Sequence, residues 1–319
     1  MVTLNDILRA QTLLQGVAVR TPLLQWTGAT AKRQLFLKLE NLQPIGAFKL
    51  RGAYNKVASL NHDERRRGVI SYSSGNHAQG VAYAARAMGV KAVIVMPGNA
   101  PENKLAATAN LGAEIVTVGP GSEERRLRAE QLAAEHGYVV VPPYNDEKIV
   151  AGQGTVGIEI LEDLPEVQTV LVPVGGGGII SGVSAAIKLT NPAVKVIGVE
   201  PELAADAQAS LRAGHIVSFP ASEVSRTLAD GLRTQSIGEI NFEHIRTYVD
   251  DIVSVKEDEI LEAVRALSGN PKTIAEPSGA TAVAAFLFHS SELPQTRNNV
   301  AVITGGNIDP QLLAEIRKA

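Results

Sequence analysis

Short apolar segments alternate along the chain with longer, alanine-rich segments. The short segments are rich in Val and Ile and predict β-strands, whereas the longer ones repeat hydrophobic residues at helical spacing. The predicted strands cover residues 35–40, 68–73, 92–96, 113–118, 138–142, 169–174, 194–199 and 299–304. Several are almost wholly apolar, as in Val93-Ile94-Val95, which is typical of parallel sheets covered on both faces. The sequence therefore predicts an α/β fold with open, mostly parallel sheets flanked by helices.

The spacing of these elements predicts two domains. Residues 71–118 hold two consecutive βαβ units, which are compact enough for a small domain, and another unit starts at residue 167. The Pro-Gly-rich segment 42–52 links the first strand to the small domain, so the chain enters one domain, crosses and returns. We expect residues 1–51 and 143–319 to form the large domain and residues 52–142 the small one, with the break near Pro142 and Pro143.

Composition excludes several classes of function. The 319 residues carry 30 Lys and Arg against 33 Asp and Glu, so the formal net charge is −3 and no basic excess favours nucleic acid or an anionic membrane. The absence of Cys excludes disulfides, thiolate metal sites and a cysteine nucleophile, and is compatible with a reducing cytoplasm. We expect no signal peptide, no membrane span and no separate C-terminal regulatory domain.

A run of four glycines lies between an apolar predicted strand and a predicted helix over residues 180–189: Gly175, Gly176, Gly177 and Gly178. A backbone without Cβ atoms can approach a ligand closely, and the N–H groups at a helix start attract anions. A dinucleotide site is the first rival, since Glu200 ends the next strand, but Ser181 replaces the third glycine of G-x-G-x-x-G. The run therefore favours a phosphate monoester.

A second strand-to-helix turn carries Ser73, Ser74, Gly75, Asn76 and His77. Hydroxyls, an amide and free backbone N–H groups at a helix start can hold a carboxylate, although Ser and Asn are also ordinary helix caps. His77 alone is better explained as a packed or capping residue than as a base. Capping and carboxylate binding both remain open for this turn.

Lys49 lies next to Phe48 and two residues before Arg51, in a neighbourhood of small residues. Burial and a nearby cation both disfavour the ammonium form, which is what a lysine needs to form a Schiff base. A single lysine is usually solvated surface. The combination of such a lysine with a phosphate cradle and a carboxylate-binding turn, however, indicates pyridoxal phosphate acting on an amino acid.

Nearly the whole chain resembles the fold type II pyridoxal-phosphate enzymes of the serine/threonine dehydratase and serine racemase family, whose fold is like that of the tryptophan synthase β chain. The resemblance rests on motifs in the same order, among them Gly46 to Ala53, Ser73 to Gln79, Gly175 to Gly178, Ala229 to Leu232 and Thr304 to Asn307. It implies that Lys49 binds the cofactor covalently, that Phe48 and Asn76 contact its ring and 3-hydroxyl, and that the four glycines hold its phosphate. It further implies that residues 73–77 bind the substrate carboxylate, that the small domain is mobile and that the chain forms a homodimer.

Other positions bear on the reaction. Ala47 stands where the family commonly has Ser, and Ile45 where Thr or Ser is frequent, so hydrogen bonding near the lysine differs. Ser74 matches the racemases and some 3-hydroxyaspartate dehydratases, in which it is the base on the face opposite the lysine. Thr304 stands where the family places a neutral partner for the pyridine nitrogen, which favours elimination over transamination.

The resemblance also implies a divalent cation site. In racemase-like members two acids and a backbone carbonyl hold the ion, and the matching positions are Glu200, Asp206 and the carbonyl of Ala204. Oxygen ligands suit Mg²⁺ or Ca²⁺. The alternative is that Asp206, with Glu202, only places negative charge at a helix N-terminus.

We therefore expect a cytoplasmic, pyridoxal-phosphate-dependent ammonia-lyase that converts a small L-β-hydroxy amino acid, threonine or serine, to a 2-keto acid and ammonia. One alternative within the family is a serine racemase or a 3-hydroxyaspartate dehydratase. An alternative outside enzymes is a small-molecule-binding protein on the same fold, which would have no need for Lys49.

Overall fold

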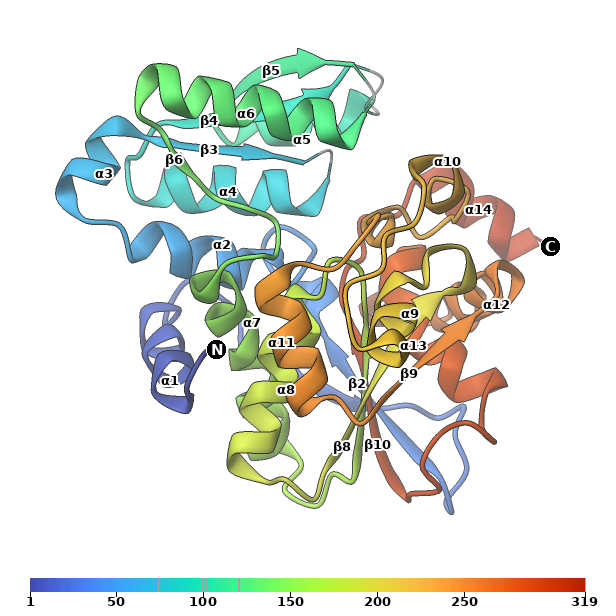
Figure 1. The fold of residues 1–319 in the computed structure, drawn as a ribbon. Helices are drawn as coiled ribbons and strands as arrows, with labels where there is room; N and C mark the ends of the chain where they lie inside the picture. The colour runs from blue at the N-terminus through green and yellow to red at the C-terminus, as the bar shows by residue number, and fades with distance from the viewer. Residues whose placement is uncertain (74, 99, 101, 120, 319) are drawn as a thin grey trace.

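The computed structural model describes residues 1–73, 75–98, 100, 102–119 and 121–318. The chain forms two lobes, each built around one sheet (Figure 1). We call the lobe with the six-stranded sheet the large lobe and the lobe with the four-stranded sheet the small lobe. The α/β class with mostly parallel sheets is confirmed.

The large sheet has the strand order β1-β2-β10-β7-β8-β9. Only the pairing of β1 with β2 is antiparallel. Its strands are β1 (Leu23–Gln25), β2 (Gln34–Leu39), β7 (Thr169–Pro173), β8 (Lys195–Pro201), β9 (Asp251–Val255) and β10 (Asn298–Ile303). The α-helices of this lobe are α1 (Leu4–Leu13), α7 (Glu147–Asp163), α8 (Gly178–Thr190), α9 (Asp206–Ala213), α10 (Ala221–Val224), α11 (Glu239–Tyr248), α12 (Glu257–Leu267), α13 (Pro277–Phe288) and α14 (Pro310–Lys318). Short 3-10 turns, η1 (Glu40–Leu42), η2 (Glu202–Ala204), η3 (Asp230–Leu232) and η4 (Pro271–Thr273), join them.

Hydrophobic helices cover both faces of the large sheet. Along β10, Ala301 and Ile303 pack toward α12, α13 and α14, whereas Val300 and Val302 pack toward α7, α8 and α11. Successive side chains of a strand point to opposite faces, so a strand covered on both faces has to be apolar at every position. The continuous apolar runs in the sequence have this cause.

The small sheet is parallel throughout and has the order β5-β4-β3-β6. Its elements are α2 (Lys49–Ala58), α3 (His62–Arg67), β3 (Val69–Tyr72), α4 (Asn76–Ala87), β4 (Ala92–Pro97), α5 (Glu102–Asn110), β5 (Glu114–Val118), α6 (Ser122–His136) and β6 (Val139–Val140). Helices α2 and α4 cover the face that carries Ile94, and α6 covers the face that carries Val93. Figure 1 shows α4 on the side of this sheet that faces the large lobe.

Every predicted strand is present, with ends shifted by at most two residues. The prediction missed β1, which has three residues, and β9, in which Asp251 and Ser254 interrupt the apolar pattern. It also started two helices late, since the helix predicted from residue 180 begins at Gly178 (α8) and the helix predicted from residue 78 begins at Asn76 (α4). The strand predicted over residues 35–40 ends at Leu39, because Glu40 begins η1.

Helix α2 lies at the junction of the two lobes and packs against both α4 and α7. The crossing of α2 and α7 is so close that a Cβ atom added at Gly152 would lie 2.6 Å from the Cα atom of Gly52. Because a larger residue at either position would force the helices apart, the glycines fix the place of the first turn of α2. Lys49 is the first residue of that helix.

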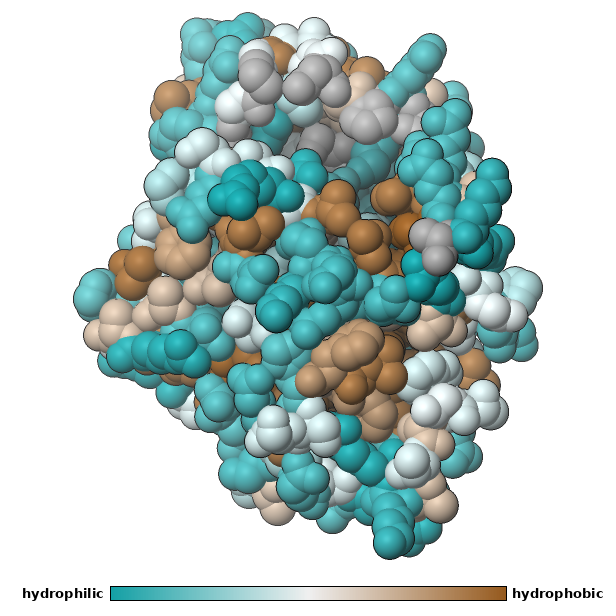
Figure 2. Space-filling model, turned by 90° about the vertical axis from the view of Figure 1, so that its right-hand side faces the viewer, coloured by the Kyte–Doolittle hydropathy of each residue, from teal (hydrophilic) through white to brown (hydrophobic). Residues whose placement is uncertain are grey.

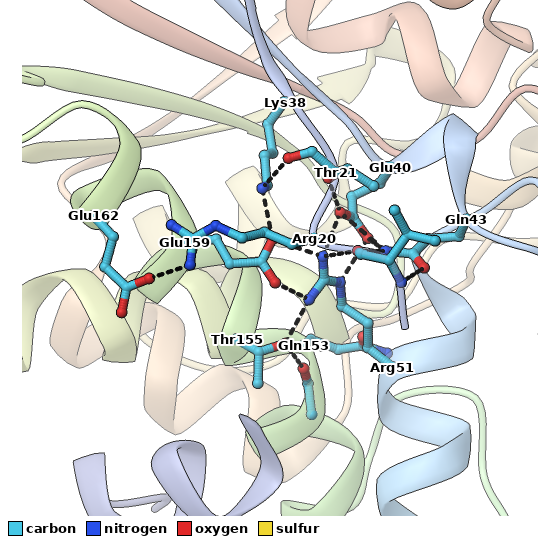
Figure 3. A network of polar contacts seen from close by, with 12 residues as sticks. Arg20, Thr21, Lys38, Glu40, Gln43, Arg51, Gln153, Thr155, Glu159 and Glu162 are labelled. Carbon is cyan, nitrogen blue, oxygen red and sulfur yellow. Dashed lines mark hydrogen bonds and ion pairs between the residues drawn. The ribbon is translucent and has the colours of Figure 1, made fainter. Parts of the chain in front are cut away.

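A buried ionic network also joins these elements (Figure 3). Arg51 of α2 pairs with Glu40 at 2.8 Å and with Glu159 of α7 at 2.6 Å, and Lys38 of β2 pairs with Glu159 at 2.6 Å. The Arg51 and Lys38 side chains are 1% and 0% exposed. The network connects α2 and α7 to strand β2 of the large sheet.

The face drawn in Figure 2 is mostly hydrophilic, with its hydrophobic residues in separate patches. Large exposed hydrophobic residues are distributed over several elements, for example Leu8, Leu127 and Phe288. Among the described residues, no helix combines the length and the apolarity that a membrane crossing needs.

Candidate active site

A cavity of about 390 Å³ lies where the two lobes meet, and residues of both lobes line it. Strands β7 and β10 of the large sheet and β3 of the small sheet all lead into it, because their carboxyl ends continue into the lining segments. This edge is where open α/β sheets bind ligands. Most of the predicted site residues line this one cavity: Phe48, Lys49, Ser73, Gly75, Asn76, His77, Gly175, Gly176, Gly177, Gly178 and Thr304.

The Lys49 amine is held inside the cavity. Its Nζ donates a hydrogen bond to the carbonyl oxygen of Pro143 at 2.8 Å and lies 5.2 Å from the centre of the Phe48 ring. Burial lowers the pKa of Lys49 from 10.5 to about 8. Because the neutral amine is the nucleophile, Lys49 is prepared for bond formation with a carbonyl group near neutral pH.

Tertiary contacts fix the backbone just before Lys49 and the turn that the Lys49 amine contacts. The Phe48 N–H donates to the carbonyl oxygen of Thr304 at 3.1 Å, and Ala47 forms a β-bridge with Gly305. On the other side of the cavity, Asp146 caps α7 by accepting from the N–H groups of residues 148 and 149, which anchors the turn that carries Pro143.

Gly175, Gly176 and Gly177 form a buried loop between β7 and α8, and Gly178 is the first residue of α8. Gly177 has a φ of +93°, a conformation that side chains disfavour. A Cβ atom added at Gly176 would lie 2.2 Å from the ring of Tyr144. Helix α8 starts directly after the loop, and the first N–H groups of a helix have no partner within it. The loop is therefore suited to bind a phosphate group.

Ser73, Gly75, Asn76 and His77, the described residues of the second predicted turn, line the same cavity from the small lobe. Within the turn, the Gly75 N–H donates to Ser73 Oγ at 3.3 Å, and α4 begins at Asn76. His77 is buried, with Nε2 located 3.0 Å from the carbonyl oxygen of Val141. Burial, assisted by the charge of Lys49, lowers the pKa of His77 to about 3, so its ring is neutral. A carboxylate at this turn would be bound by hydrogen bonds and the helix start, without a histidine charge.

Asn76 of the small lobe and Thr304 of the large lobe both line the cavity. Asn76 Nδ2 donates to Glu276 Oε1 at 2.6 Å, and Asn76 Oδ1 accepts from Asn307 Nδ2 at 2.7 Å. Thr304, at the end of β10, donates from Oγ1 to the carbonyl oxygen of Ser278 at 3.3 Å. Its hydroxyl is a neutral group that can also accept a hydrogen bond.

A family model of pyridoxal-phosphate dependent enzymes matches residues 14–305. The chain belongs to this family. It is 47% identical over 319 residues to the L-threonine ammonia-lyase of Thermotoga maritima, covering 99% of this chain and 78% of the relative. It is also 39% identical over 316 residues to the L-threo-3-hydroxyaspartate ammonia-lyase of Saccharomyces cerevisiae, covering 98% and 96%. Among solved structures, maize serine racemase aligns with a TM-score of 0.93 at 35% identity, covering 98% of this chain and 96% of the other.

The residues in the cavity fit the cofactor of the pyridoxal-phosphate enzymes. The cofactor carries a phosphate, an aldehyde and an aromatic ring, and the cavity offers a glycine cradle, an amine of lowered pKa and the Phe48 ring. A Cβ atom at Gly176 would collide with Tyr144, so the cradle tolerates no side chain at this position. The chemistry of the cavity therefore agrees with the family.

The proposed cation ligands lie away from this cavity lining, at the end of β8. Glu200 and Asp206 are both fully buried. Glu200 accepts from the N–H groups of Ala207 and Gln208 at 3.1 and 2.8 Å, whereas neither Asp206 side-chain oxygen has a hydrogen-bond partner among the described atoms. Burial and the neighbouring Asp206 raise the pKa of Glu200 well above its usual range, and burial raises that of Asp206 to about 7.

Two buried acids without a cationic partner fit a hard divalent cation, which would relieve their mutual repulsion. Ala204 lies in η2, just before Asp206, and is also buried. The described residues contain no group of three or more His, Cys, Asp or Glu side chains that could hold a metal ion. A cation at this place would therefore depend on the backbone carbonyl and on water in addition to the two acids.

Three features of the cavity were given no role from the sequence, although Asp230 lies in one of the motifs that carry the family resemblance. Glu276 is buried beside Asn76, Tyr144 covers the glycine loop, and Asp230 of the large lobe pairs with Lys104 of the small lobe. Glu276 precedes Pro277 at the start of an apolar helix, a pattern that indicates an ordinary helix start. Local sequence signals therefore do not reveal these residues as parts of a site. Ser74 lies outside the residues that the structure describes, and its role stays a prediction.

Proposed function

We propose that this chain is a pyridoxal-phosphate-dependent ammonia-lyase that acts on a small L-β-hydroxy amino acid, with threonine or serine as the leading substrate. The observation that carries the proposal is the convergence of Lys49, the glycine loop and the 73–77 turn on one cavity. The relative at 47% identity is named an L-threonine ammonia-lyase, which supports the same reaction class.

When bound, the cofactor supplies an aldehyde for the substrate amine and a ring that withdraws electrons from the α-carbon. The backbone N–H groups of Gly175 to Gly178 hold its phosphate, and Phe48 and Asn76 contact its ring. The substrate carboxylate binds at the 73–77 turn, where Ser73, Gly75, Asn76 and His77 line the cavity and hydrogen bonds orient it. Ser74 is assigned to the same role from the family resemblance. Thr304 offers a neutral hydroxyl to the pyridine nitrogen.

Lys49 is the base in this proposal. Its amine takes the α-proton of the substrate, which a pKa of about 8 allows near neutral pH. The β-hydroxyl group leaves with a proton as water. A second water molecule then replaces the nitrogen, so the products are a 2-keto acid and ammonia.

The test is keto-acid release from a panel of threonine, serine, 3-hydroxyaspartate and phenylserine, with the Lys49→Ala variant beside the wild type. A positioned base contributes about 10²–10⁴-fold to the rate, and Lys49→Ala also removes the covalent link to the cofactor. Lys56→Ala is the matched control, because Lys56 lies in the same helix and pairs with Asp146 at 2.6 Å. Near-normal turnover by folded Lys49→Ala would refute the assignment. Absence of visible cofactor absorbance and of keto acid in the wild type would favour the non-catalytic alternative.

A second candidate is a serine racemase or 3-hydroxyaspartate dehydratase, which the identity of residue 74 favours. Racemisation needs proton transfer on the face opposite Lys49, whereas elimination does not. If Ser74 is the second base, Ser74→Ala abolishes D-serine formation but largely retains keto-acid release. If Ser74 only caps the following helix, Ser74→Ala should lower the stability by about 0.5–2 kcal/mol and should not lower one activity more than the other. Chiral chromatography and a coupled keto-acid assay distinguish these outcomes.

The proposal includes four finer points. Glu200, Asp206 and the Ala204 carbonyl bind Mg²⁺ or Ca²⁺, which the burial of both carboxylates side by side supports. Residues 52–142 form a small mobile domain that moves against residues 1–51 and 143–319, as the position of the cavity between the two lobes supports. The chain forms a homodimer, a proposal that rests on the family resemblance and that light scattering can test. It acts in the cytoplasm, which localisation of a tagged chain can test.

A further inference from the structure

Hydrogen bonds fix the orientation of the Asn76 amide. Asn307 Nδ2 donates to the carbonyl oxygen of Ile45 at 2.9 Å and to Asn76 Oδ1 at 2.7 Å. A carbonyl oxygen can only accept, and an amide nitrogen has two hydrogens, so these bonds use both hydrogens of Asn307. Asn76 Oδ1 is therefore the acceptor, and its Nδ2 faces Glu276 at 2.6 Å.

One Nδ2 hydrogen of Asn76 remains for a ligand. Among the described residues, Glu276 is the acceptor from this nitrogen, and Asn76 lines the cavity. Because both ends of the amide are held, the direction of the second N–H is also fixed. A donor that needs no reorientation binds its acceptor at a lower entropic cost.

Glu276 is itself rigidly held and 4% exposed. Its N–H donates to the carbonyl oxygen of Gly305 at 3.1 Å, and its own carbonyl oxygen accepts from Gly279 and Ala280 at 2.8 and 3.0 Å. A Cβ atom at Gly305 would lie 2.2 Å from Glu276 Oε1 and 3.1 Å from Asn76 Nδ2, so the glycine leaves room for this contact.

An ordinary capping role does not explain the Glu276 side chain. Glu276 precedes α13, but its carboxylate makes no hydrogen bond to the first turn of that helix. Burying a carboxylate is costly unless it is hydrogen-bonded, and here the bond goes to Asn76, 200 residues away in the sequence. The side chain therefore serves the cavity.

We propose that Glu276 is a positioning residue for the cofactor. Its carboxylate accepts a hydrogen bond from Asn76 and thereby directs the second Asn76 N–H toward the oxygen on the cofactor ring. This inference rests on the proposed function, since it presumes that the ring lies against Asn76. Glu276 acts through Asn76 and is not assigned a proton transfer.

The charge of Glu276 should also make cofactor binding depend on pH. Burial and the charge of Asp230 raise its pKa to about 7, against the lowering effects of Asn76 and Lys104. The protonated carboxyl still accepts through its carbonyl oxygen, so the contact persists at acidic pH. Above pH 7 the added negative charge disfavours the anionic cofactor. The other titratable groups among the described residues that line the cavity are Lys49, Tyr72, His77, Lys104, Glu123, Arg125, Arg126, Tyr144, Asp230 and Arg233.

The experiment measures pyridoxal phosphate affinity by titrating the apoprotein at pH 6 and pH 8.5. Glu276→Ala removes the acceptor and is expected to weaken binding about 10- to 100-fold at pH 6. At pH 8.5 its deficit relative to the wild type should be smaller, because the variant also lacks the negative charge. Glu276→Gln keeps an acceptor oxygen without the charge, so it should retain most of the affinity at pH 6. It should also lose less affinity than the wild type between pH 6 and pH 8.5, and the comparison cancels the titration of groups present in both proteins.

Two further variants keep the test decisive. Glu257→Gln is the matched control, because Glu257 accepts one backbone hydrogen bond, from Leu228, and does not line the cavity. Asn307→Ala removes the hydrogen bond that holds the other end of the Asn76 amide, so it should weaken cofactor binding to a similar extent as Glu276→Ala. It replaces Glu276→Ala in the test if that variant does not fold. Affinities of the Glu276 and Asn307 variants equal to that of Glu257→Gln would overturn the inference. A wild type that binds no pyridoxal phosphate would instead refute the proposed function.

Discussion

Replacement of Arg51 by Met should destabilise the protein strongly, because its guanidinium neutralises two buried acids (Figure 3). Arg51 donates to Glu40 through Nε and Nη2, both at 2.8 Å, and to Glu159 through Nη1 and Nη2 at 2.6 and 2.9 Å. Its remaining bonds go to Thr155 and to the carbonyl oxygen of Val19. The arginine side chain is 1% exposed and that of Glu40 0%.

The magnitude follows from what the variant leaves behind. Met fills much of the volume but leaves Glu40 with hydrogen bonds from Thr21 and Gln43 and no direct ion pair. Removing one partner of a buried ion pair costs about 3–5 kcal/mol. Each kcal/mol lowers the melting temperature of a chain of this size by about 2 °C, so we expect a decrease of about 6–10 °C.

The variant should also reverse the pH dependence that Glu40 contributes. Burial raises the pKa of Glu40, but Arg51, Lys38 and Thr21 together lower it further, so the folded pKa is below 4.5. Its contribution to stability is therefore present above pH 4.5 and is lost as the pH falls through the folded pKa. Without Arg51 the burial effect prevails, and Glu40 then costs stability as the pH rises.

The assay is calorimetric melting at pH 5 and pH 8. Arg246→Met is the control, because its pair with Glu243 is exposed at 56% and 51%. Such a pair contributes about 0–1 kcal/mol, so the control should lose no more than about 2 °C. If Arg51→Met melts within 2 °C of the control at both pH values, the network does not stabilise the lobe junction as argued.

Three further predictions concern the ligands. Gly176→Ala should weaken pyridoxal phosphate binding, since its Cβ would lie 2.2 Å from the Tyr144 ring, and unchanged affinity in a titration would place the phosphate elsewhere. The rate at which the apoprotein binds pyridoxal phosphate covalently should rise with pH through about 8, the pKa of Lys49, because the neutral amine reacts; a midpoint near the ordinary lysine value would contradict its burial. Mg²⁺ or Ca²⁺ at 100 times its dissociation constant should add about 2.7 kcal/mol of stability, and this gain should disappear in Asp206→Asn. A melting temperature that is the same with metal and with chelator would exclude the cation site.

The alternation of apolar and helical segments was sufficient to predict the α/β class and every strand with a continuous apolar pattern. The four glycines and Lys49 were also visible in the sequence, because a glycine run after a buried strand is rare without a functional cause. Strand β9 was missed, although Asp251 and Ser254 interrupt its apolar residues at the same positions as Glu114 and Thr117 in the predicted strand β5, and although it pairs with β8 along five residues. Pairing with a neighbouring strand is a property of the sheet and leaves little trace in the local sequence.

The contacts that complete the candidate site were decided by tertiary structure alone. Lys49 is 94 residues from Pro143, and Asn76 is 200 residues from Glu276. Periodicity reports which face of an element is buried, but it does not report which polar groups meet at the ends of the strands. Arg51 shows the same limit, since a charged residue is usually exposed and only its burial between Glu40 and Glu159 makes it a structural element. The sequence by itself determined the elements and the reactive groups, whereas the packing of two lobes determined their partners and pKa values, because solvation and charge proximity depend on residues that are distant in the chain.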